Sequence, residues 1–241
     1  MAVEIKLMKD VVENPTVIEG FPSKGFVSTI ATKYMIDDLG MELIGYVKSD
    51  KIRSLAVVHN SKAMHPVRIY AKGNIILIFS EITVPITDTG EFADAFREWF
   101  LKIKPERVIL LAGITGKGIE KEHEIFGVAS TPELNELMKR LDINVIGEGM
   151  LVGISSDILL NCMDDDIPTI SLMAETEYTP DPLGAASMLR MLNTILDLDI
   201  QIDKLVDKGK EIEEEFKDIA KQLKRGKESH KEMDGFSPMY G

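Results

Sequence analysis

Two runs of consecutive apolar residues constrain the fold of this chain more than any other feature of its sequence. Residues 75–79 read Ile-Ile-Leu-Ile-Phe and residues 108–112 read Val-Ile-Leu-Leu-Ala, so neither run alternates with polar positions. A strand that is apolar on both faces is typically covered by helices on each side, as in parallel sheets. The two runs therefore predict a three-layer α/β sandwich whose central sheet is mostly parallel.

Shorter strand-like and helix-like segments alternate around these two runs. Strands are predicted at residues 2–7, 16–19, 42–48, 54–59, 67–70 and 169–173. Helices are predicted over residues 26–39, 91–102, 183–196 and from residue 131 onward, and segments 150–152 and 158–162 continue the alternation. Gly40 is placed to end the first helix in the left-handed conformation. Thr131 followed by Pro132 is a favoured N-cap and N1 pair, which marks where another helix begins.

The charge and composition of the chain exclude several classes of protein. The chain carries 40 Asp and Glu residues against 28 Lys and Arg residues, for a formal net charge of −12. A chain this acidic lacks the basic surface of a nucleic-acid-binding protein, and an anionic membrane would repel it. No apolar run approaches the roughly 20 residues of a membrane helix, and no signal-peptide pattern is present at the start. With Cys162 as the only cysteine, the sequence predicts a cytoplasmic globular protein.

The composition changes near residue 198 and divides the chain into three predicted parts. Residues 1–198 form the α/β domain, residues 199–225 a charged amphipathic helix, and residues 226–241 a flexible tail. Apolar residues of the middle part recur at alternating spacings of four and three, which is typical of one helical seam. The seam consists of Ile202, Leu205, Gly209, Ile212, Phe216, Ile219 and Leu223. It packs either on the chain's own domain or on a second chain, and the sequence leaves both open.

Two segments resemble ligand-binding motifs in composition only. Residues 113–118, Gly-Ile-Thr-Gly-Lys-Gly, follow a buried strand as a phosphate loop does. They lack the Walker spacing and the Ser or Thr after the lysine, so a turn between strand and loop is the better interpretation. Residues 164–166 are three consecutive aspartates without the alternating oxygen ligands and the glycine of a calcium loop. They are interpreted as an acidic loop between a helix and a strand, and the sequence predicts no metal and no cofactor.

The remaining candidates for catalysis are one thiol and three carboxylates. Cys162 lies in an apolar run, where a buried small hydrophobic side chain is the expected role. Glu175, Glu177 and Asp181 follow a strand near its carboxyl end, where ligands of open α/β sheets bind. Paired carboxylates at that position could transfer protons. Because no phosphate loop, metal site or associated base accompanies them, the sequence predicts a protein that is not an enzyme.

The final residues carry the most specific signal for a partner. Met239 offers an apolar side chain, Tyr240 combines a large apolar body with a hydroxyl group, and Gly241 presents the carboxylate. Pro238 restricts the backbone just before them, and a polar linker separates them from the seam. Residues 239–241 are therefore predicted to bind a protein partner.

Three ordered motifs give the chain a family resemblance. Residues 20–31 read Gly-Phe-Pro-Ser-Lys-Gly-Phe-Val-Ser-Thr-Ile-Ala, and residues 110–114 read Leu-Leu-Ala-Gly-Ile. Residues 174–177, Ala-Glu-Thr-Glu, are followed by Asp-Pro-Leu-Gly-Ala-Ala at 181–186. In this order the motifs resemble those of the proteasome assembly chaperone family, specifically its archaeal homologues, over roughly the first 200 residues.

The resemblance implies both a fold and a role. It implies an α/β fold similar to that of nucleoside phosphorylases, without a catalytic site. The family's hydrophobic-Tyr-X (HbYX) tail, matched here by Met239, Tyr240 and Gly241, inserts between neighbouring α subunits of the 20S proteasome. The resemblance assigns Met239 as apolar anchor, Tyr240 as gate-region contact and Gly241 as carboxylate donor. It also implies a homo-oligomer that acts as an assembly chaperone or as an ATP-independent activator.

Two other functions compete with this interpretation. One is a small-molecule transferase or nucleotide-dependent ligase that uses the carboxyl edge of the sheet, which would need a phosphate loop or a metal site. The other is a scaffold for a different partner, with a tail that matches the motif by chance. The motifs favour the proteasome-binding interpretation over both.

Overall fold

The computed structural model describes residues 3–52, 55–116, 123–212, 214 and 216. Its strands are β1 (Glu4–Leu7), β2 (Thr16–Gly20), β3 (Glu42–Lys48), β4 (Val57–His59), β5 (Lys62–Met64), β6 (Val67–Lys72), β7 (Ile75–Ser80), β8 (Arg107–Thr115), β9 (Ile125–Ala129), β10 (Asn144–Val145) and β11 (Thr169–Thr176). Its α-helices are α1 (Val27–Leu39), α2 (Thr89–Ile103), α3 (Pro132–Arg140), α4 (Ile154–Asp164), α5 (Pro182–Leu196) and α6 (Ile202–Asp207). Short 3-10 turns lie at η1 (Lys24–Phe26) and η2 (Asp50–Ile52).

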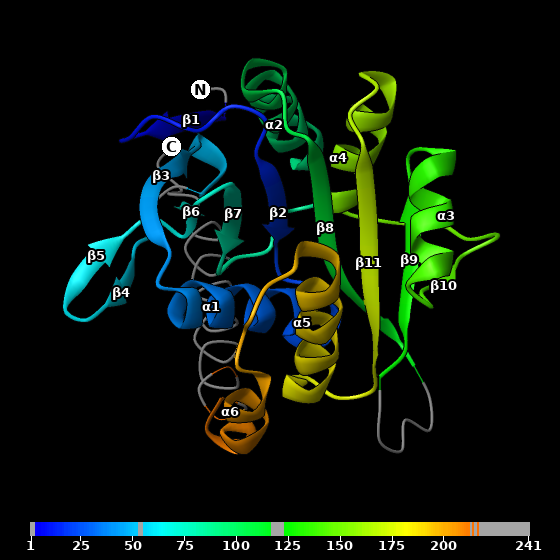
Figure 1. Cartoon of the computed structure of the whole chain (residues 1–241). Coiled ribbons are helices and arrows are strands. Elements are labelled where there is room, and N and C mark those ends of the chain that lie inside the picture. The colour runs from blue at the N-terminus through cyan, green and yellow to red at the C-terminus, as the bar shows by residue number, and fades with distance from the viewer. Residues whose placement is uncertain (1–2, 53–54, 117–122, 213, 215, 217–241) are drawn as a thin grey trace, which may run out of the picture.

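One large mixed sheet forms the middle of the molecule (Figure 1). Its strand order is β1-β3-β6-β7-β2-β8-β11-β9-β10. The central strands β7, β2, β8 and β11 are parallel to their neighbours within this group. Antiparallel pairs flank them, through β6 on one side and β9 on the other. The predicted α/β fold with a mostly parallel central sheet is confirmed, with antiparallel pairs added toward both edges.

Helices cover both faces of the central strands. Helices α1 and α5 pack together on one face, and α2 and α4 pack together on the other (Figure 1). In β2, Ile18 joins the core beneath α1 and α5, whereas Val17 joins the core beneath α2 and α4. In β7, Leu77 joins the core beneath α1 and α5, and Ile76 joins the core beneath α2 and α4. The apolar runs of the central strands thus fill two cores, because successive side chains of a strand point to opposite faces.

Local capping signals act as the sequence predicts. The Thr131 hydroxyl accepts a hydrogen bond from the Leu134 amide at 3.3 Å, and Pro132 begins α3. Gly40 follows α1 in the left-handed conformation, with φ of 59°. The predicted start of that helix at Phe26 is one residue early, because Phe26 itself is left-handed, with φ of 55°. The turn η1 precedes it and delays the regular helix to Val27.

Three segments differ from the predicted alternation. The strand predicted at 54–59 is the short β4, which pairs with β5 in a separate two-stranded hairpin outside the main sheet. Residues 150–152 lie in no helix or strand, and Met150 is 93% exposed. Strands β9 and β10 are not among the predicted elements. Within the described part of the chain, no helix is both long and apolar enough to cross a membrane.

The described part of the C-terminal seam packs on the chain's own domain. Ile202, Leu205 and Phe216 are buried in the core that α1 and α5 share, and Ile212 packs partly buried against it. The ring of Phe216 lies 5.9 Å from that of Phe26, centroid to centroid, at the start of α1. Helical residues continue from Gly209 after a turn at Lys208. Ile219 and Leu223 lie outside the described residues.

Charged substitutions in this seam test its packing. We expect Phe216→Asp combined with Ile212→Asp to lower the free energy of unfolding by several kcal/mol, because an unpaired carboxylate would replace a buried ring. Chemical denaturation and far-UV circular dichroism measure the effect. Glu211→Ala, at an exposed position of the same helix, is the control. Unchanged stability and helicity in the double variant would contradict the packing of the seam on the core.

Candidate functional site

The three motifs that carry the family resemblance meet at one place in the fold. Residues 20–26 connect β2 to α1, Gly113 lies near the carboxyl end of β8, and Thr176 ends β11. Because β2, β8 and β11 are parallel, these ends share one edge of the sheet (Figure 1). This is the edge at which open α/β sheets bind their ligands.

Glycines allow the 20–26 loop to lie directly on the strands. A Cβ atom at Gly113 would lie 2.1 Å from the carbonyl oxygen of Lys24. Gly25 has φ of 68°, and a Cβ there would lie 2.5 Å from the Thr176 hydroxyl. The Gly113 amide donates a hydrogen bond to the Ser23 hydroxyl at 2.9 Å. Close approach of backbones explains why glycine stands at these motif positions.

Asp181, one of the three carboxylates considered as candidates for catalysis, caps a helix. Its Oδ1 accepts a hydrogen bond from the Gly184 amide at 2.9 Å at the start of α5, and its Oδ2 accepts one from the Thr176 hydroxyl at 2.6 Å. His123 Nδ1 lies 3.5 Å from the same Oδ2 and donates to the backbone carbonyl of Glu175 at 2.6 Å. Thr176, Asp181 and His123 are all buried. Asp181 therefore serves a structural role in a cluster that leaves no exposed reactive group.

The structure does not bring Glu175, Glu177 and Asp181 together around a cleft. Glu175 and Thr176 are consecutive residues of β11, so their side chains point to opposite faces of the sheet. Asp181 is hydrogen-bonded to Thr176 and therefore lies on the face of the sheet opposite to the Glu175 side chain. Glu177 is exposed beyond the strand end. The paired arrangement that acid–base catalysis needs is not formed by these three carboxylates.

The other sequence candidates also have structural roles. Cys162 is buried on the inner side of α4, and burial raises the pKa of its thiol to about 11, so the reactive thiolate is scarce at neutral pH. Asp165, at the end of α4, forms two hydrogen bonds of 2.6 Å with Arg97 of α2, which lower the pKa of the Asp165 carboxyl. The acidic segment 164–166 is thus a helix end tied to its neighbour. Among the described residues, no group of three or more His, Cys, Asp and Glu side chains could hold a metal ion.

The glycine-containing segment that follows the buried strand is only partly described. Residues 113–115 are still part of β8, so the strand is longer than predicted. Residues 117–122, which include the lysine of the Gly-Lys-Gly sequence, lie outside the described residues.

Sequence reasoning missed a buried carboxyl at Glu19. Its side chain is fully buried at the carboxyl end of β2. Oε1 accepts a hydrogen bond from the Phe21 amide at 2.7 Å, and Oε2 accepts one from the Ser155 hydroxyl at 2.9 Å. Burial raises the pKa of Glu19 to about 7 despite these bonds. One charged residue within an otherwise apolar and β-branched strand is the signal that could have identified it.

The raised pKa of Glu19 predicts a specific dependence of stability on pH. Below the ordinary pKa of 4.5 both the folded and the unfolded chain hold this proton. As the pH rises from there to about 7, the unfolded chain releases it first, so this group's contribution to stability falls by about 3 kcal/mol. Glu19→Gln removes that loss, and its stability relative to wild type should rise by about this amount between pH 5 and pH 8. Urea denaturation at both pH values measures this difference in the free energy of unfolding. Glu177→Gln, at an exposed position, is the control. Equal changes in stability with pH in the two variants would contradict the raised pKa of Glu19.

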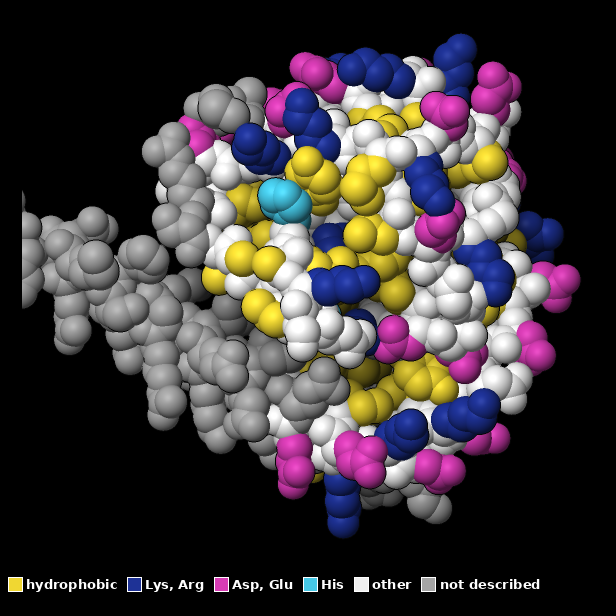
Figure 2. Space-filling view, turned by 90° about the vertical axis from the view of Figure 1, so that its left-hand side faces the viewer, with side chains coloured by type: hydrophobic (Ala, Val, Ile, Leu, Met, Phe, Trp, Pro, Cys, Tyr) yellow, Lys and Arg dark blue, Asp and Glu magenta, His cyan; other side chains and the backbone are white. Residues whose placement is uncertain are grey.

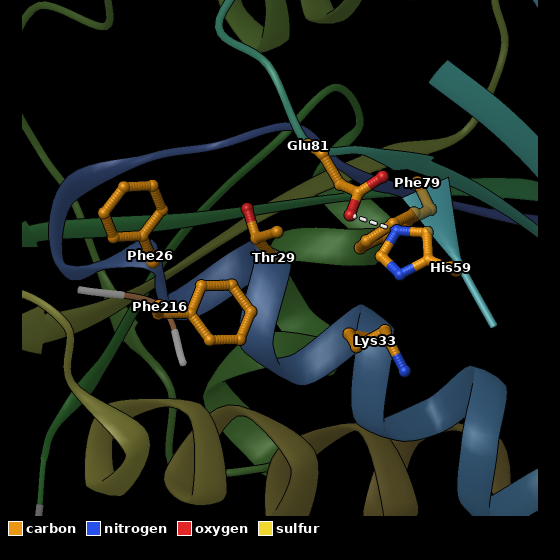
Figure 3. Close-up of a pocket in the computed structure, with 7 residues that line it drawn as sticks. All are labelled: Phe26, Thr29, Lys33, His59, Phe79, Glu81 and Phe216. Carbon is orange, nitrogen blue, oxygen red and sulfur yellow. Dashed lines mark hydrogen bonds and ion pairs between the residues drawn. The ribbon is translucent and has the colours of Figure 1, made fainter. Parts of the chain in front are cut away.

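A small cavity lies on the α1 face, between the helix and the β4–β5 hairpin (Figure 3). Its volume is about 10 Å³, close to the minimum for one water molecule. His59 Nε2 lies 2.7 Å from Glu81 Oε1 at its edge, and Arg68 Nη2 lies 2.7 Å from Glu81 Oε2. The side chains drawn around it are those of Phe26, Thr29, Lys33, His59, Phe79, Glu81 and Phe216. The space is too small for a substrate. The contact between His59 and Glu81 joins the hairpin to the main sheet.

The face formed by β1, β3 and the β4–β5 hairpin exposes apolar side chains. Figure 2 shows hydrophobic side chains gathered near its centre, with lysine, arginine and acidic side chains among and around them. Leu7 and Met8, at and just after the end of β1, are 40% and 54% exposed, and Val58 of β4 is 67% exposed. Exposed apolar area of this kind is characteristic of surfaces that bind other proteins.

Comparison with known proteins identifies the family. The family model described as the PAC2 family matches residues 17–220, which include all three motifs. The chain belongs to the PAC2 family. A relative that is similar along nearly its whole length is an uncharacterized protein of Methanocaldococcus jannaschii. The two are 34% identical over 230 residues, which cover 95% of this chain and 93% of the relative.

Solved PAC2-family structures share the fold described above. The crystal structure of Pyrococcus furiosus PbaA, an archaeal homolog of proteasome-assembly chaperone, matches with a TM-score of 0.85 and 29% identity, and the match covers 92% of this chain and 99% of PbaA. Pyrococcus furiosus PbaB, an archaeal proteasome activator, matches with a TM-score of 0.77 and 21% identity over 91% of this chain and 99% of PbaB. The predicted resemblance to archaeal homologues of proteasome assembly chaperones is thereby confirmed for the domain. The tail residues 239–241 lie outside both the family match and the described residues.

Proposed function

We propose that this PAC2-family protein binds the proteasome and acts without catalysis, as an assembly chaperone or an ATP-independent activator. The observation that carries the proposal is the match to PbaA along 92% of the chain, at 29% identity. The sequence adds a C-terminal Met-Tyr-Gly, the hydrophobic-Tyr-X pattern. The partners are the α subunits of the 20S particle, and the compartment is the cytoplasm.

In this proposal residues 239–241 form the contact with the α ring. Met239 fills an apolar pocket between neighbouring α subunits, Tyr240 contacts the gate region, and Gly241 supplies the carboxylate to a cationic group. These residues have roughly 25 non-hydrogen atoms, which at about 0.3 kcal/mol per atom supply roughly 7.5 kcal/mol. That corresponds to a dissociation constant on the order of micromolar for a single tail.

A homo-oligomer would raise the apparent affinity of so weak an anchor. Several tails that engage one ring bind at a high effective concentration after the first has docked. The linker composition of residues 226–238 gives a reach of roughly 20 Å for a coil of that length, enough for the domain to stay on the ring face. The exposed apolar face around Leu7, Met8 and Val58 supports self-association as the source of the oligomer.

The geometry at the motif cluster supports a role without catalysis. The Asp181 carboxylate caps α5 through a hydrogen bond, and Cys162 is buried with a raised thiol pKa. The transferase or ligase alternative would need a phosphate loop, and the strand continues through residues 113–115, where such a loop would begin.

A pull-down with mature 20S particles and with free α subunits, run separately, tests the proposal. An activator is retained on mature particles and raises peptide hydrolysis by them, whereas an assembly chaperone is retained on free α subunits. Retention on either supports proteasome binding. A chain that folds but is retained on neither would contradict it.

A further inference from the structure

A second cavity lies on the opposite face of the sheet from the one in Figure 3, beside the start of α4. Its volume is about 290 Å³, which suits a small metabolite. The loop after β2, the carboxyl end of β8 and the middle of β11 form its floor and one wall, and residues 150–156 form the other wall. We call it the α4 cleft.

Hydrogen-bond donors converge on the α4 cleft. Gly153, the N-cap of α4, has φ of 107° and no side chain with which to cap the first amides of the helix. The amides of Ser156 and Asp157 turn back to the Gly153 carbonyl. The amides before them have no acceptor within the helix, and the helix dipole favours negative charge at this end. The exposed Lys24 adds a positive charge on the opposite wall.

A hydroxyl group that faces the cleft has no protein partner in the described part of the chain, which is independent of the start of the helix. Ser171 of β11 lines the cleft and is only 4% exposed. Among the described residues its hydroxyl forms no hydrogen bond, whereas the Ser155 hydroxyl donates to Glu19. The Ser171 hydroxyl is not closed off from the cleft, so it is available to a molecule that occupies the cleft. A ligand oxygen in the cleft would provide the partner that Ser171 lacks.

The mouth of the cleft is apolar. Met150, Leu151 and Val152 are consecutive, line it, and are 93%, 36% and 79% exposed. Such a rim accommodates an apolar group attached to the anion. Glu19 lies beneath the cleft, and its two oxygens are occupied by the Phe21 amide and the Ser155 hydroxyl.

From these observations we infer that the α4 cleft binds a small organic phosphate monoester. The phosphate contacts the first amides of α4, the Ser171 hydroxyl and Lys24, and the organic group lies against Met150, Leu151 and Val152. The residues that line this site are different from residues 239–241, so the inference adds a small-molecule ligand to a protein proposed to act through its tail.

Titration of the full chain with phenyl phosphate, followed by amide NMR at constant ionic strength, tests the inference. We expect saturable shifts centred on Ile154, Ser155 and Ser171, with tighter binding than for inorganic phosphate and no such shifts with phenol. Ser171→Ala should weaken binding about tenfold, and Lys24→Ala, an exposed change that leaves the fold intact, several-fold. Lys62→Ala, at an exposed position of the β4–β5 hairpin, is the control and should bind as wild type does.

Two results would overturn the inference. One is an absence of saturable shifts at the start of α4. The other is equal weakening by Lys24→Ala and Lys62→Ala, which would show general attraction of the anion to surface lysines.

Discussion

Replacing Gly113 by alanine is expected to lower the free energy of unfolding by about 3 kcal/mol or more, at the upper end for overpacking substitutions. The added Cβ would lie 2.1 Å from the Lys24 carbonyl oxygen and 3.0 Å from its carbonyl carbon. Both are backbone atoms, so no side-chain rotation can relieve the clash. The loop of residues 20–26 would have to move off β8, and the hydrogen bond from the Gly113 amide to Ser23 would be lost.

Gly147→Ala is the matched control, because no atom lies within 4 Å of the Cβ it would add. Urea denaturation of both variants against wild type measures the difference. A Gly113→Ala protein as stable as the control would show that the loop does not rest on the strand end as described.

The central strands could be predicted because their signal is local. Residues 75–79 and 108–112 are apolar at every position, and a strand in a covered sheet needs nothing else to be recognised. The direction and partner of β9 could not be predicted, because antiparallel pairing with β11 depends on contacts distant in sequence. The sequences of β4 and β5 resemble those of any short strands. Their position outside the main sheet depends on packing.

The capping role of Asp181 could have been predicted from the sequence, where it was considered only as a candidate for catalysis. Asp181 followed by Pro182 is the same N-cap and N1 signal that located α3 at Thr131 and Pro132. The cap alone therefore predicts a structural role for this carboxyl group. The meeting of Gly113 with Lys24 could not be predicted, because 89 residues separate them (113 − 24) and only the folded sheet brings their backbones into contact.

The heptad spacing alone could not identify the surface on which the C-terminal seam packs. The spacing is the same for a helix that packs on its own domain and for one that packs on another chain. Burial of Leu205 and Phe216 in the core shared by α1 and α5 answers the question for the described part. The sequence offers no sign of this choice.

Deleting residues 239–241 is expected to abolish binding to 20S particles while the fold and the oligomer stay intact. The anchor supplies roughly 7.5 kcal/mol per tail in the proposal above, so its loss removes the main contact from every subunit at once. Tyr240→Ala should have nearly the same effect, because it removes the larger of the two side chains of the anchor and its contact with the gate region. One residue added after Gly241 should also prevent binding, because it moves the carboxylate away from its cationic partner. Ser237→Ala, just outside the anchor, is the matched control and should bind as wild type does.

Surface plasmon resonance on immobilised 20S particles tests the central claim most directly. The proposal predicts saturable binding by the wild-type chain and by Ser237→Ala. It predicts no binding by the chain that lacks residues 239–241, with light scattering showing that its mass per oligomer is otherwise unchanged. Full-strength binding by the truncated chain would contradict the claim that the tail is the anchor.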